Sequence, residues 1–452
     1  MEYDARKTAL EVLNTLNQGK KTLDAILSEV PGEEKFGSKR DRALFTALVY
    51  GVLRWRGRLD YIIDYFSNTP IHKIEPAVLN ILRLGLFQII FLDRIPDSAA
   101  VNTAVELTKQ SASTRAAGFV NALLRKAAGH YTKVPFSTFA NNPVDFLTNN
   151  RSLPNWIAQR WLKRFNPETI ATLCDTINSI PPITIRTNTL KTTRAELILS
   201  LEGDVECLDK TPFAPDGLKI INPHQSIPEL AGFKKGWFQV QDEAAQLVSL
   251  LLNPKPGETV LDACAGLGGK TAHIAQLMQN KGNIVALDKN EKKLQQLGFE
   301  MQRLSISIVH ARCYDLNSSL NNKQVGLFDR VLLDAPCSGL GVLRRNPDIK
   351  WNSAEADLRR HANIQKRLLV NLANILKPKG ILVYSVCSIE PEENEAVINA
   401  FLKNHPEFVI DKSPGGLPEN LPSQVEPQTG FKTLPLLDNM DGFFLVRLRK
   451  IE

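Results

Sequence analysis

The sequence predicts a multidomain protein that is all-α over residues 1–140 and α/β from residue 141 to the end. Three observations lead to this fold class. Apolar residues recur at helical spacing through residues 1–140. Residues 141–250 mix short strand and helix patterns, as a small α/β subdomain does. Residues 251–452 alternate apolar strands with helices, which is typical of a parallel sheet covered on both faces.

The N-terminal segment predicts a bundle of roughly five to seven helices. One helical face of residues 5–16 carries four apolar side chains, those of Ala9, Val12, Leu13 and Leu16. Pro and Gly stand mainly between the apolar segments, where helices end. Further helices are expected over residues 41–55, 75–92, 98–110 and 116–128.

A basic and aromatic cluster, RWRGR, occupies residues 54–58 of this segment. Arginine and aromatic groups together hold phosphate and stack on unpaired bases. We therefore treat Arg54, Arg56 and Arg58 as candidate RNA-binding residues. The alternative is a solvated helix end with one half-buried Trp. The net charge of +7 permits a nucleic-acid partner without requiring one.

Cysteine and histidine usage argues against disulfides and metal sites. Six cysteines are spread over 452 residues, no CxxC occurs, and the seven histidines fall in no metal-ligand spacing. We expect free thiols and no metal. The start of the chain lacks a signal-peptide pattern, and the strongest apolar run, residues 82–92, is too short to span a bilayer. These features predict a cytoplasmic protein, and we expect a monomer.

The middle segment, residues 141–250, predicts a linker followed by mixed elements. Asn and Pro are frequent over residues 141–155, as they are in linkers. The elements expected next are helices over residues 154–165, 167–177 and 241–253, and strands over 183–188, within 204–222 and over 236–241.

The C-terminal segment predicts a doubly wound sheet. Its expected strands are five apolar runs, over residues 259–263, 283–290, 306–312, 328–337 and 380–387. The final run, residues 443–450, follows no long crossover helix, so we expect an antiparallel strand at the edge of the sheet.

A glycine-rich turn, AGLGGK, follows the first of these strands and opens a helix. Its glycines, Gly266, Gly268 and Gly269, let the backbone come close to a ligand. A P-loop is excluded by spacing, because its first glycine would have to stand at Cys264. Asp288 ends the next strand, 22 residues after Gly266, where an acid can accept hydrogen bonds from both hydroxyls of a ribose.

Two more acids, Asp315 and Asp334, follow the third and fourth strands. A row of acids suits a compact cationic cofactor with an adenine and would repel a pyrophosphate. S-adenosylmethionine is therefore favoured over a dinucleotide, which would make the protein a nicotinamide dehydrogenase. The alternative is that Asp288 and Asp315 are only helix caps or turn residues.

Two cysteines, Cys337 and Cys387, follow the fourth and fifth strands. If these strands are neighbours, both thiols face the cofactor's methyl group. Methyl transfer to C5 of a pyrimidine needs such a thiol, because addition of a thiolate at C6 makes C5 nucleophilic. Asp334 is placed to hold N3–H and the amino group of a cytosine, and the second thiol to help release the product. The alternative is that both are small core residues.

An acidic run, PEENE, begins at Pro391. Pro391, Glu392 and Glu393 are expected in the first turn of a helix, where Pro is tolerated and acids favour the helix dipole. The helix end would lower the pKa of the upstream Cys387 and the acids would raise it. The residues alone leave the net direction open, and they do not choose which cysteine attacks.

Four motifs carry a resemblance to a known family: residues 262–271, 332–351, 384–395 and 441–448. On these motifs the chain resembles the RNA cytosine-5 methyltransferases of the Fmu/Sun family. Residues 95–109 and 118–126 resemble the NusB-like RNA-binding domain. The resemblance implies a NusB-like bundle over 1–140, an RNA-contacting subdomain within 141–250, and a Rossmann-like class I S-adenosylmethionine methyltransferase domain over 251–452.

The resemblance also implies site residues and a substrate. Cys387 is the expected nucleophile and Cys337 the residue that promotes product release. A cytosine of 16S ribosomal RNA, flipped out of its stack, is the expected target. We infer that Lys270 orients Asp334 or the target base, and that Arg344 and Arg345 hold the RNA backbone. The expected cofactor contacts are Cys264, Ala265, Gly266, Leu267, Gly268, Gly269, Lys270, Asp288, Asp315 and Asp334.

Two positions depart from the family's pattern. Leu267 stands where Pro is usual, and Val386 stands where Thr is usual, so that a hydroxyl beside Cys387 is missing. Neither change removes a group that the chemistry requires. Two other functions remain open at this point: a transfer RNA as the substrate, and an RNA-binding assembly or transcription factor with an inactive methyltransferase scaffold.

Overall fold

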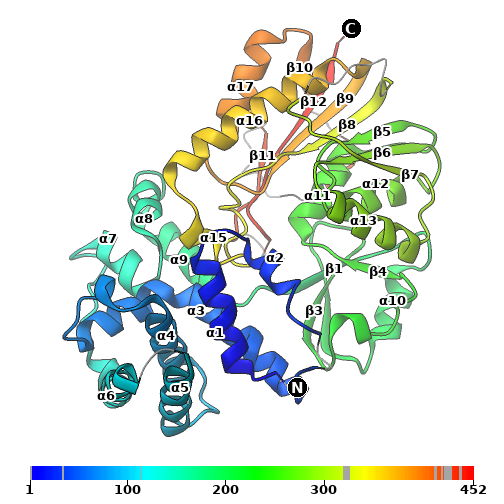
Figure 1. Ribbon diagram of the computed structural model, residues 1–452. Helices are drawn as coiled ribbons and strands as arrows, with labels where there is room; N and C mark the ends of the chain where they lie inside the picture. The colour runs from blue at the N-terminus through cyan, green and yellow to red at the C-terminus, as the bar shows by residue number, and fades with distance from the viewer. Residues whose placement is uncertain are drawn as a thin grey trace. The chain divides into compact units, whose positions relative to one another are not determined.

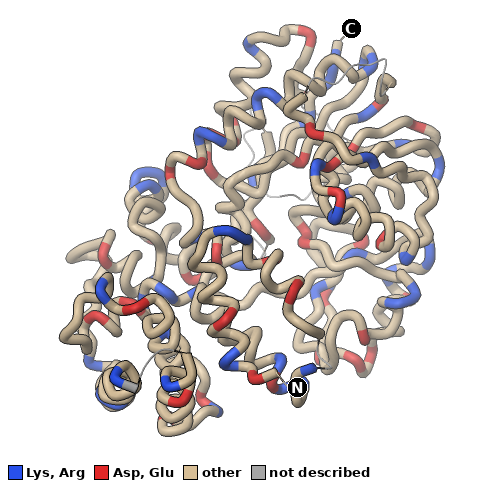
Figure 2. Tube along the Cα trace, viewed as in Figure 1, with Lys and Arg blue, Asp and Glu red and all other residues tan. Residues whose placement is uncertain are grey.

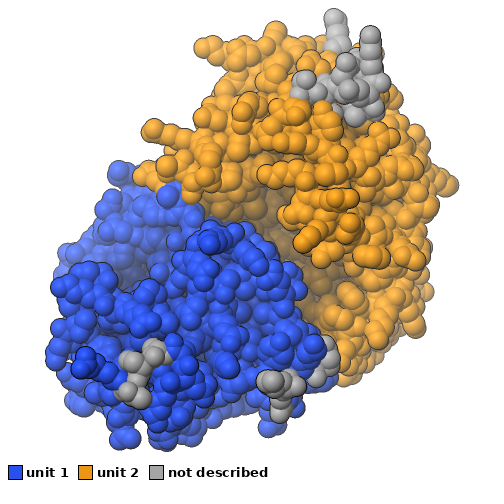
Figure 3. Space-filling model, viewed as in Figure 1, with its two compact units in different colours: residues 1–179, 343–354 blue, residues 180–342, 355–452 orange. Residues whose placement is uncertain are grey.

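The computed structural model describes residues 3–32, 35–111, 114–318, 326–411, 415–418, 421, 430–436 and 440–451. Contacts divide the chain into two compact units (Figure 3). The first, called unit 1, contains residues 1–179 and 343–354, and unit 2 contains residues 180–342 and 355–452. The predicted fold class is confirmed, because an all-α region precedes an α/β region with a large sheet.

Unit 1 begins as a bundle of helices. Its first six helices are α1 (Ala5–Asn17), α2 (Leu23–Leu27), α3 (Lys39–Phe66), α4 (Pro76–Phe91), α5 (Asp97–Ser111) and α6 (Thr114–His130). Side-chain caps fix two of their starts, since Asp4 accepts a hydrogen bond from the backbone of Lys7 and Ser38 accepts one from Asp41. Their apolar faces form one core.

Helix α3 is longer than the sequence predicted. Its apolar periodicity continues through Leu59, Ile62 and Phe66, all buried, so the helix does not end near residue 55. The cluster RWRGR therefore lies inside a helix and not at a helix end.

The rest of unit 1 folds back onto α3. Residues expected to be part of a linker instead form short helical turns, α7 (Pro143–Asp145) and η4 (Phe146–Asn150), followed by α8 (Asn155–Leu162) and α9 (Pro167–Asn178). A short helix from the distant segment 343–354, α15 (Ile349–Asn352), also belongs to this unit. Its Trp351 donates from Nε1 to the carbonyl of Leu53 at 2.6 Å.

Unit 2 contains a small antiparallel sheet in the order β2-β3-β1-β4. Its strands are β1 (Ile183–Thr187), β2 (Val205–Lys210), β3 (Gly217–Pro223) and β4 (Phe238–Val240), and α10 (Arg194–Leu201) packs against it. Helix α10 starts with a capping box in which Thr193 and Glu196 bond each other's backbone. The strands predicted in this region are therefore confirmed.

The large sheet of unit 2 has the order β10-β12-β9-β8-β5-β6-β7 (Figure 1). Its central strands run parallel, and β12 pairs antiparallel with β9. The strands are β5 (Thr259–Asp262), β6 (Asn283–Asp288), β7 (Val309–Cys313), β8 (Phe328–Asp334), β9 (Leu376–Val386), β10 (Phe408–Ile410), β11 (Phe431–Lys432) and β12 (Phe444–Lys450).

The expected edge position of β12 is wrong. The three-residue strand β10 pairs with the other side of β12, so β10 lies at that edge of the sheet. A strand this short carries too little periodicity to be recognised in a sequence. The antiparallel direction of β12 is confirmed.

Helices cover the large sheet and complete its core. They are α11 (Glu243–Leu252), α12 (Gly269–Leu277), α13 (Glu291–Leu304), α16 (Glu355–Ala373) and α17 (Glu395–Asn404). Apolar residues of α16 and α17 share a core cluster with alternate residues of β8 and β9. Helices α12 and α13 pack on the β6 and β7 part of the sheet (Figure 1).

Charge is spread over both units. Figure 2 shows Lys and Arg interspersed with Asp and Glu along the trace of each unit. Among the residues that the structure describes, none of the helices has the length and apolarity needed to cross a membrane. The same residues contain no group of side chains suited to hold a metal ion.

Candidate active site at the carboxyl ends of the parallel strands

The two cysteines at the strand ends lie next to each other in unit 2. Strands β8 and β9 are parallel neighbours, with Asp334 opposite Ser385 in the register. Cys337 follows β8 and Cys387 follows β9, and their Sγ atoms are 3.3 Å apart. Both are free thiols. The expectation that these strands are neighbours is confirmed.

Backbone contacts tie the loops that carry the two thiols. The amide of Gly341, four residues after Cys337, donates to the carbonyl of Cys387 at 3.0 Å. The carbonyl of Gly341 accepts from the amide of Gly442 at 2.8 Å. A Cβ at position 341 would collide with the carbonyl oxygen of Gly442, so only glycine fits this close approach. The relative placement of the thiols is thus fixed by the backbone as well as by side chains.

The surroundings make the two thiols unequal. The hydrogen bond to Cys387 raises the pKa of the Cys337 thiol well above its ordinary value, and burial and the charge of Glu393 act in the same direction. Cys337 therefore remains a protonated thiol at neutral pH. In that state it can donate its proton to the sulfur of Cys387, which leaves Cys387 as the acceptor of the pair.

Asp334 lies between a cation and a hydroxyl at the end of β8. Its Oδ2 is 2.6 Å from Nζ of Lys270, and its Oδ1 accepts from the hydroxyl of Ser385 at 2.7 Å. Burial lowers the pKa of Lys270, but the adjacent Asp334 outweighs burial, so the pKa is raised above its ordinary value. The site therefore holds a fixed ammonium–carboxylate pair at the ends of β8 and β9, the two strands that precede the cysteines.

The glycine turn joins β5 to α12. Gly266 and Gly268 have positive φ angles of 56° and 86°. A Cβ at Gly268 would meet Cγ of Leu297 at 2.7 Å, whereas at Gly266 no described atom lies within 4 Å. Leu267 between them is 53% exposed. The turn therefore presents open backbone and one apolar side chain on its outer side.

Asp288 ends β6 beside this turn. Its Oδ2 accepts from the amide of Gly266 at 3.0 Å, and its Oδ1 accepts from the amide of Asn290 at 2.8 Å. A carboxylate has further lone pairs, so Asp288 can still accept from a ligand hydroxyl. The acid predicted to contact a ribose is thus held against the glycine turn.

The remaining predicted cofactor residues differ in exposure. Burial raises the pKa of the Cys264 thiol, which makes it an inert, partly buried side chain. Asp315 is exposed, and its carboxylate accepts from the backbone and side chain of Asn317, which lower its pKa. Asp315 therefore has the contacts of a turn residue, one of the two interpretations open from the sequence. It still follows β7, whose end lies next to Asp288, since the amide of Tyr314 donates to the carbonyl of Asp288 at 3.0 Å.

Two acids of this region were missed by reasoning from the sequence. Asp262 ends β5, is 1% exposed, and accepts from the hydroxyl of Thr271 at 2.7 Å. Burial raises its pKa to about 7. Its position at a strand end, inside the first motif, was the available signal.

The second missed acid is Glu393, which is fully buried. The expectation that Pro391, Glu392 and Glu393 form the first turn of a helix is wrong, because α17 begins at Glu395 and residues 391–394 form a turn before it. The carboxylate of Glu393 instead bonds the loops of both cysteines. An acid in an acidic run gives no sequence signal that it is the buried one.

The arginines predicted to bind RNA all lie in unit 1. Arg54 is buried and donates to the carbonyl of Arg344 at 3.1 Å, and burial lowers its pKa to about 10. Arg344 is also buried. The pair Arg344–Arg345 belongs to unit 1, whereas Cys337 belongs to unit 2. The structure thus gives Arg54 and Arg344 contacts within the protein.

Arg56 and Arg58 pack on aromatic rings of the same unit. The guanidinium of Arg56 lies 5.3 Å from the ring centre of Trp351, and that of Arg58 lies 4.8 Å from the ring centre of Phe136. Arg58 also donates to the side chain of Asn150 at 3.3 Å. The guanidinium of Arg58 also lies 5.9 Å from the ring centre of Trp55, so the arginines pack on one aromatic ring of the cluster itself and on others from distant segments.

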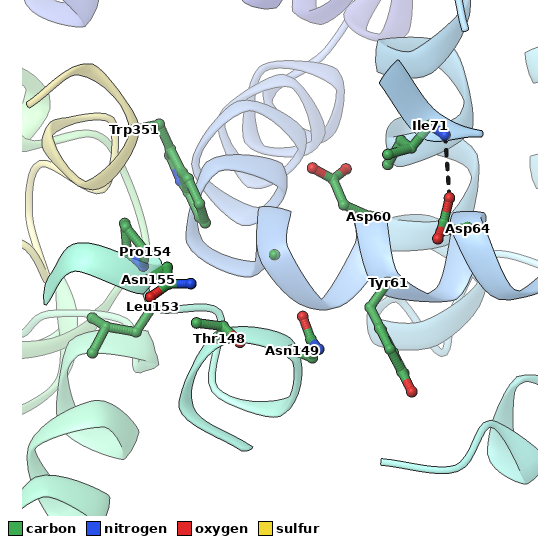
Figure 4. A pocket seen from close by; sticks show the side chains of 11 residues that line it. Asp60, Tyr61, Asp64, Ile71, Thr148, Asn149, Leu153, Pro154, Asn155 and Trp351 are labelled. Atoms are coloured by element: carbon green, nitrogen blue, oxygen red, sulfur yellow. Dashed lines mark hydrogen bonds between the residues drawn. The ribbon is translucent and has the colours of Figure 1, made fainter. Parts of the chain in front are cut away.

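A hollow of about 380 Å³ lies beside this cluster in unit 1 (Figure 4). It is lined by α3, by residues 148–155 and by Trp351. Its acids are already bonded, since Asp60 pairs with Arg83 at 2.6 Å and Asp64 accepts from the amide of Ile71 at 3.1 Å. None of the predicted site residues lines it. The chemistry of the chain therefore gathers at the strand ends of unit 2.

Family models match three parts of the chain. The model described as 16S rRNA methyltransferase RsmB/F matches residues 249–449, and the NusB family model matches residues 3–129. The ferredoxin-like domain of RsmF/B-like methyltransferases matches residues 153–226. These matches confirm the predicted resemblance and the NusB-like character of the helical region.

Known proteins are similar to this chain over all or most of its length. The chain is 38% identical to the probable ribosomal RNA small subunit methyltransferase B of Bacillus subtilis (strain 168), over 98% of both chains. The crystal structure of PH0851 is 28% identical, with a TM-score of 0.80 over 100% of both chains. A methyltransferase homolog from Pyrococcus horikoshii is 30% identical, with a TM-score of 0.58 over 69% of this chain and 99% of that one. The chain therefore belongs to the RsmB/F family of 16S rRNA methyltransferases.

Proposed function

We propose that this protein transfers a methyl group from S-adenosylmethionine to C5 of a cytosine in 16S ribosomal RNA. The observation that carries this proposal is the pair of thiols at adjacent strand ends, with Sγ atoms 3.3 Å apart and an acid–lysine pair beside them. Methyl transfer to nitrogen or oxygen needs no thiol, whereas transfer to C5 of a pyrimidine does. The name of the Bacillus subtilis relative supports the small-subunit ribosomal RNA as substrate.

The residues around the glycine turn fit S-adenosylmethionine. The turn leaves open space at Gly266, Asp288 lies against it, and the exposed Leu267 offers an apolar contact for an adenine. We propose that residues 264–270, with Asp288, Asp315 and Asp334, hold this cofactor. When bound, S-adenosylmethionine supplies an electrophilic methyl group on sulfur.

Cys387 is the proposed nucleophile. Its sulfur gives up the thiol proton and bonds to C6 of the cytosine, while the electrons of the C5–C6 double bond shift through C4 toward N3 and the ring carbonyl. The proton is taken up at N3, which makes C5 an enamine carbon. Asp334 accepts hydrogen bonds from N3–H and the amino group of the base, and Lys270 holds Asp334 in place. The base is thereby activated at C5 while its other edge is fixed.

The covalent bond must then be broken. After the methyl group has bonded to C5, solvent water takes the proton from C5 and the electrons of that C–H bond restore the C5–C6 double bond. The C6–S bond breaks, and the sulfur of Cys387 leaves as a thiolate that takes back the proton from N3. Cys337 lies 3.3 Å from that sulfur and carries a proton, so it can stabilise the departing thiolate by a hydrogen bond. The raised pKa of Cys337, which keeps its proton available, supports this division of labour.

The other parts of the chain supply RNA contacts in this proposal. We propose residues 1–140 as a NusB-like RNA-binding domain, residues 141–250 as a linker and a small RNA-contacting subdomain, and residues 251–452 as the catalytic domain. Arg54 and Arg344 are buried, whereas Arg56, Arg58 and Arg345 are partly exposed, and this exposure favours the latter three as the arginines that meet RNA.

The test is the product. Small-subunit RNA and, in a separate reaction, transfer RNA are incubated with S-adenosylmethionine and either wild type or Cys387→Ala, and methylated bases are mapped by bisulfite sequencing. The proposal expects one 5-methylcytosine with wild type and none with the variant. A methyl group on another atom or another class of base, or 5-methylcytosine on transfer RNA alone, would overturn it.

A further inference from the structure

We propose that Glu393 is a positioning residue that holds the loops of Cys337 and Cys387 at a fixed separation. The contacts of Glu393 are observed in the structure. Their importance for catalysis rests on the proposed function. Glu393 lies in the turn before α17, six residues after Cys387, and is fully buried.

The carboxylate of Glu393 bonds the residue that follows each cysteine. Its Oε1 accepts from the amide of Ser338 at 2.8 Å, and its Oε2 accepts from the hydroxyls of both Ser338 and Ser388. The two hydroxyl oxygens are only 3.3 Å apart. One oxygen atom of Glu393 therefore bridges the two cysteine loops directly.

Other contacts keep this carboxylate in place. Gln365 of α16 donates to Oε1 of Glu393 at 3.2 Å and also to the carbonyl of Pro336 at 3.0 Å. The hydroxyl of Tyr384 in β9 donates to the backbone carbonyl of Glu393 at 2.6 Å. The acid is thus held by hydrogen bonds from a helix, α16, and a strand, β9, as a positioning group must be.

The chemistry of this site requires an acid. Each serine hydroxyl has one proton to donate, and a buried carboxylate can accept from several donors at once. A glutamine in the same place has one acceptor oxygen and one NH₂ group. If its oxygen accepts from the two serine hydroxyls, its NH₂ group faces the amide of Ser338 and Nε2 of Gln365, which are both donors; in the other orientation the NH₂ group faces the hydroxyls. Glu393→Gln therefore keeps the shape of the side chain but loses at least two of the hydrogen bonds that hold the cysteine loops.

The negative charge of Glu393 has a second effect that acts in the opposite sense. Its charge helps to keep Cys337 protonated, so removal of the charge would make thiolate more available. A purely electrostatic role thus predicts that the thiols of Glu393→Gln react faster. A positioning role predicts that Cys337 and Cys387 form a disulfide less readily, and the equilibrium constant for that disulfide separates the two roles.

The experiment measures how readily Cys337 and Cys387 form a disulfide in the full chain without RNA. Two thiols give up two electrons and two protons to glutathione disulfide, which becomes two molecules of glutathione. The protein is equilibrated at pH 7 with mixtures of reduced and oxidised glutathione. Alkylation and peptide mass spectrometry then give the effective concentration of one thiol toward the other. The variants are Glu393→Gln, Ser388→Ala and, as a matched control, Glu392→Gln at the neighbouring acid.

We expect Glu393→Gln to lower this effective concentration about tenfold. Ser388→Ala, which keeps the charge and removes one arm of the bridge, should lower it in the same direction. The control should stay within about twofold of wild type. An unchanged or higher value in both Glu393→Gln and Ser388→Ala would overturn the proposal, as would a wild type that forms no such disulfide. If Glu393→Gln fails to fold in a thermal melt, Ser388→Ala decides.

A second readout links the result to catalysis. The turnover number for methyl transfer should fall about tenfold or more in Glu393→Gln, while the Kd for S-adenosylmethionine measured by calorimetry stays within about twofold of wild type. If the Kd for S-adenosylmethionine rises by the same factor as the turnover number falls, the defect of the variant is merely structural, which contradicts positioning. If wild type methylates no RNA but the disulfide results hold, the proposed function fails and the positioning role stands.

Discussion

Replacing Asp262 with asparagine should remove a pH-dependent loss of stability from unit 2. Asp262 is 1% exposed, and apart from the hydroxyl of Thr271 its carboxyl has no hydrogen-bond partner among the described residues. Burial, reinforced by the charges of Asp334 and Asp288 against opposition from Thr271 and Lys270, raises its pKa from the ordinary value of 3.8 to about 7. The folded state therefore binds this proton more tightly than the unfolded state.

The sign and size of the effect follow from that shift. A raised pKa gives stability that is fully present below pH 3.8 and is lost as the pH rises to about 7. At about 1.4 kcal/mol per pKa unit the full loss is about 4 kcal/mol, of which about 3 kcal/mol falls between pH 5 and pH 8. Asparagine does not titrate, and it can accept the same hydrogen bond from Thr271. Relative to wild type, Asp262→Asn should therefore gain stability with rising pH.

Thermal unfolding at pH 5, 6, 7 and 8 measures this difference. For a unit of this size we expect the Tm of Asp262→Asn minus that of wild type to rise by roughly 5–10 °C from pH 5 to pH 8. Asp315→Asn is the matched control, because Asp315 is an exposed acid after another parallel strand of the same sheet, β7. A Tm difference for Asp262→Asn that does not change with pH, or that falls as the pH rises, would refute the reasoning.

Three further changes test other parts of the structure. Gly341→Ala should lower the free energy of unfolding by about 1–3 kcal/mol, because its Cβ would collide with the carbonyl of Gly442. The same variant should slow methyl transfer more than it weakens cofactor binding, and an unchanged turnover number would contradict that expectation. Lys270→Met should lower turnover about 100-fold at saturating cofactor, since Asp334 loses the cation 2.6 Å away, and an equal rate would show that the pair is not needed. Lys350→Met should destabilise unit 1 by about 3 kcal/mol, because the buried amino group of Lys350 donates to the carbonyls of Arg54 and Ser152 and to the side chain of Asn178. Denaturation by urea measures the free energy of unfolding, and a loss under about 1 kcal/mol would count against this prediction.

The positions of the strand ends, and of the site residues that follow them, were predictable because local sequence patterns determine them. Apolar runs and the glycine turn are local in sequence, and parallel strands bring their carboxyl ends to one edge. That rule places Cys337 and Cys387 at the same edge of the sheet, and the pairing of β8 with β9 in the structure makes them neighbours. The short strand β10 was not predictable, because three residues show no periodicity.

Roles set by long-range contacts were not predictable. The burial of Arg54 depends on Arg344, which stands 290 positions later in the chain. Glu393 was one acid among several until Ser338, 55 positions earlier, was placed beside it. In both cases a charged residue has the same sequence context whether it meets solvent or a distant segment.

In the proposed reaction Cys387 forms the covalent bond to the RNA base, and Cys337 promotes the release of the product by stabilising the departing thiolate. Cys337→Ala is mixed with small-subunit RNA and S-adenosylmethionine, and denaturing electrophoresis measures protein joined covalently to RNA. We expect an adduct to accumulate with Cys337→Ala and to disappear in the double variant with Cys387→Ala. An adduct that persists in the double variant, or one that accumulates with Cys387→Ala alone, would contradict the account.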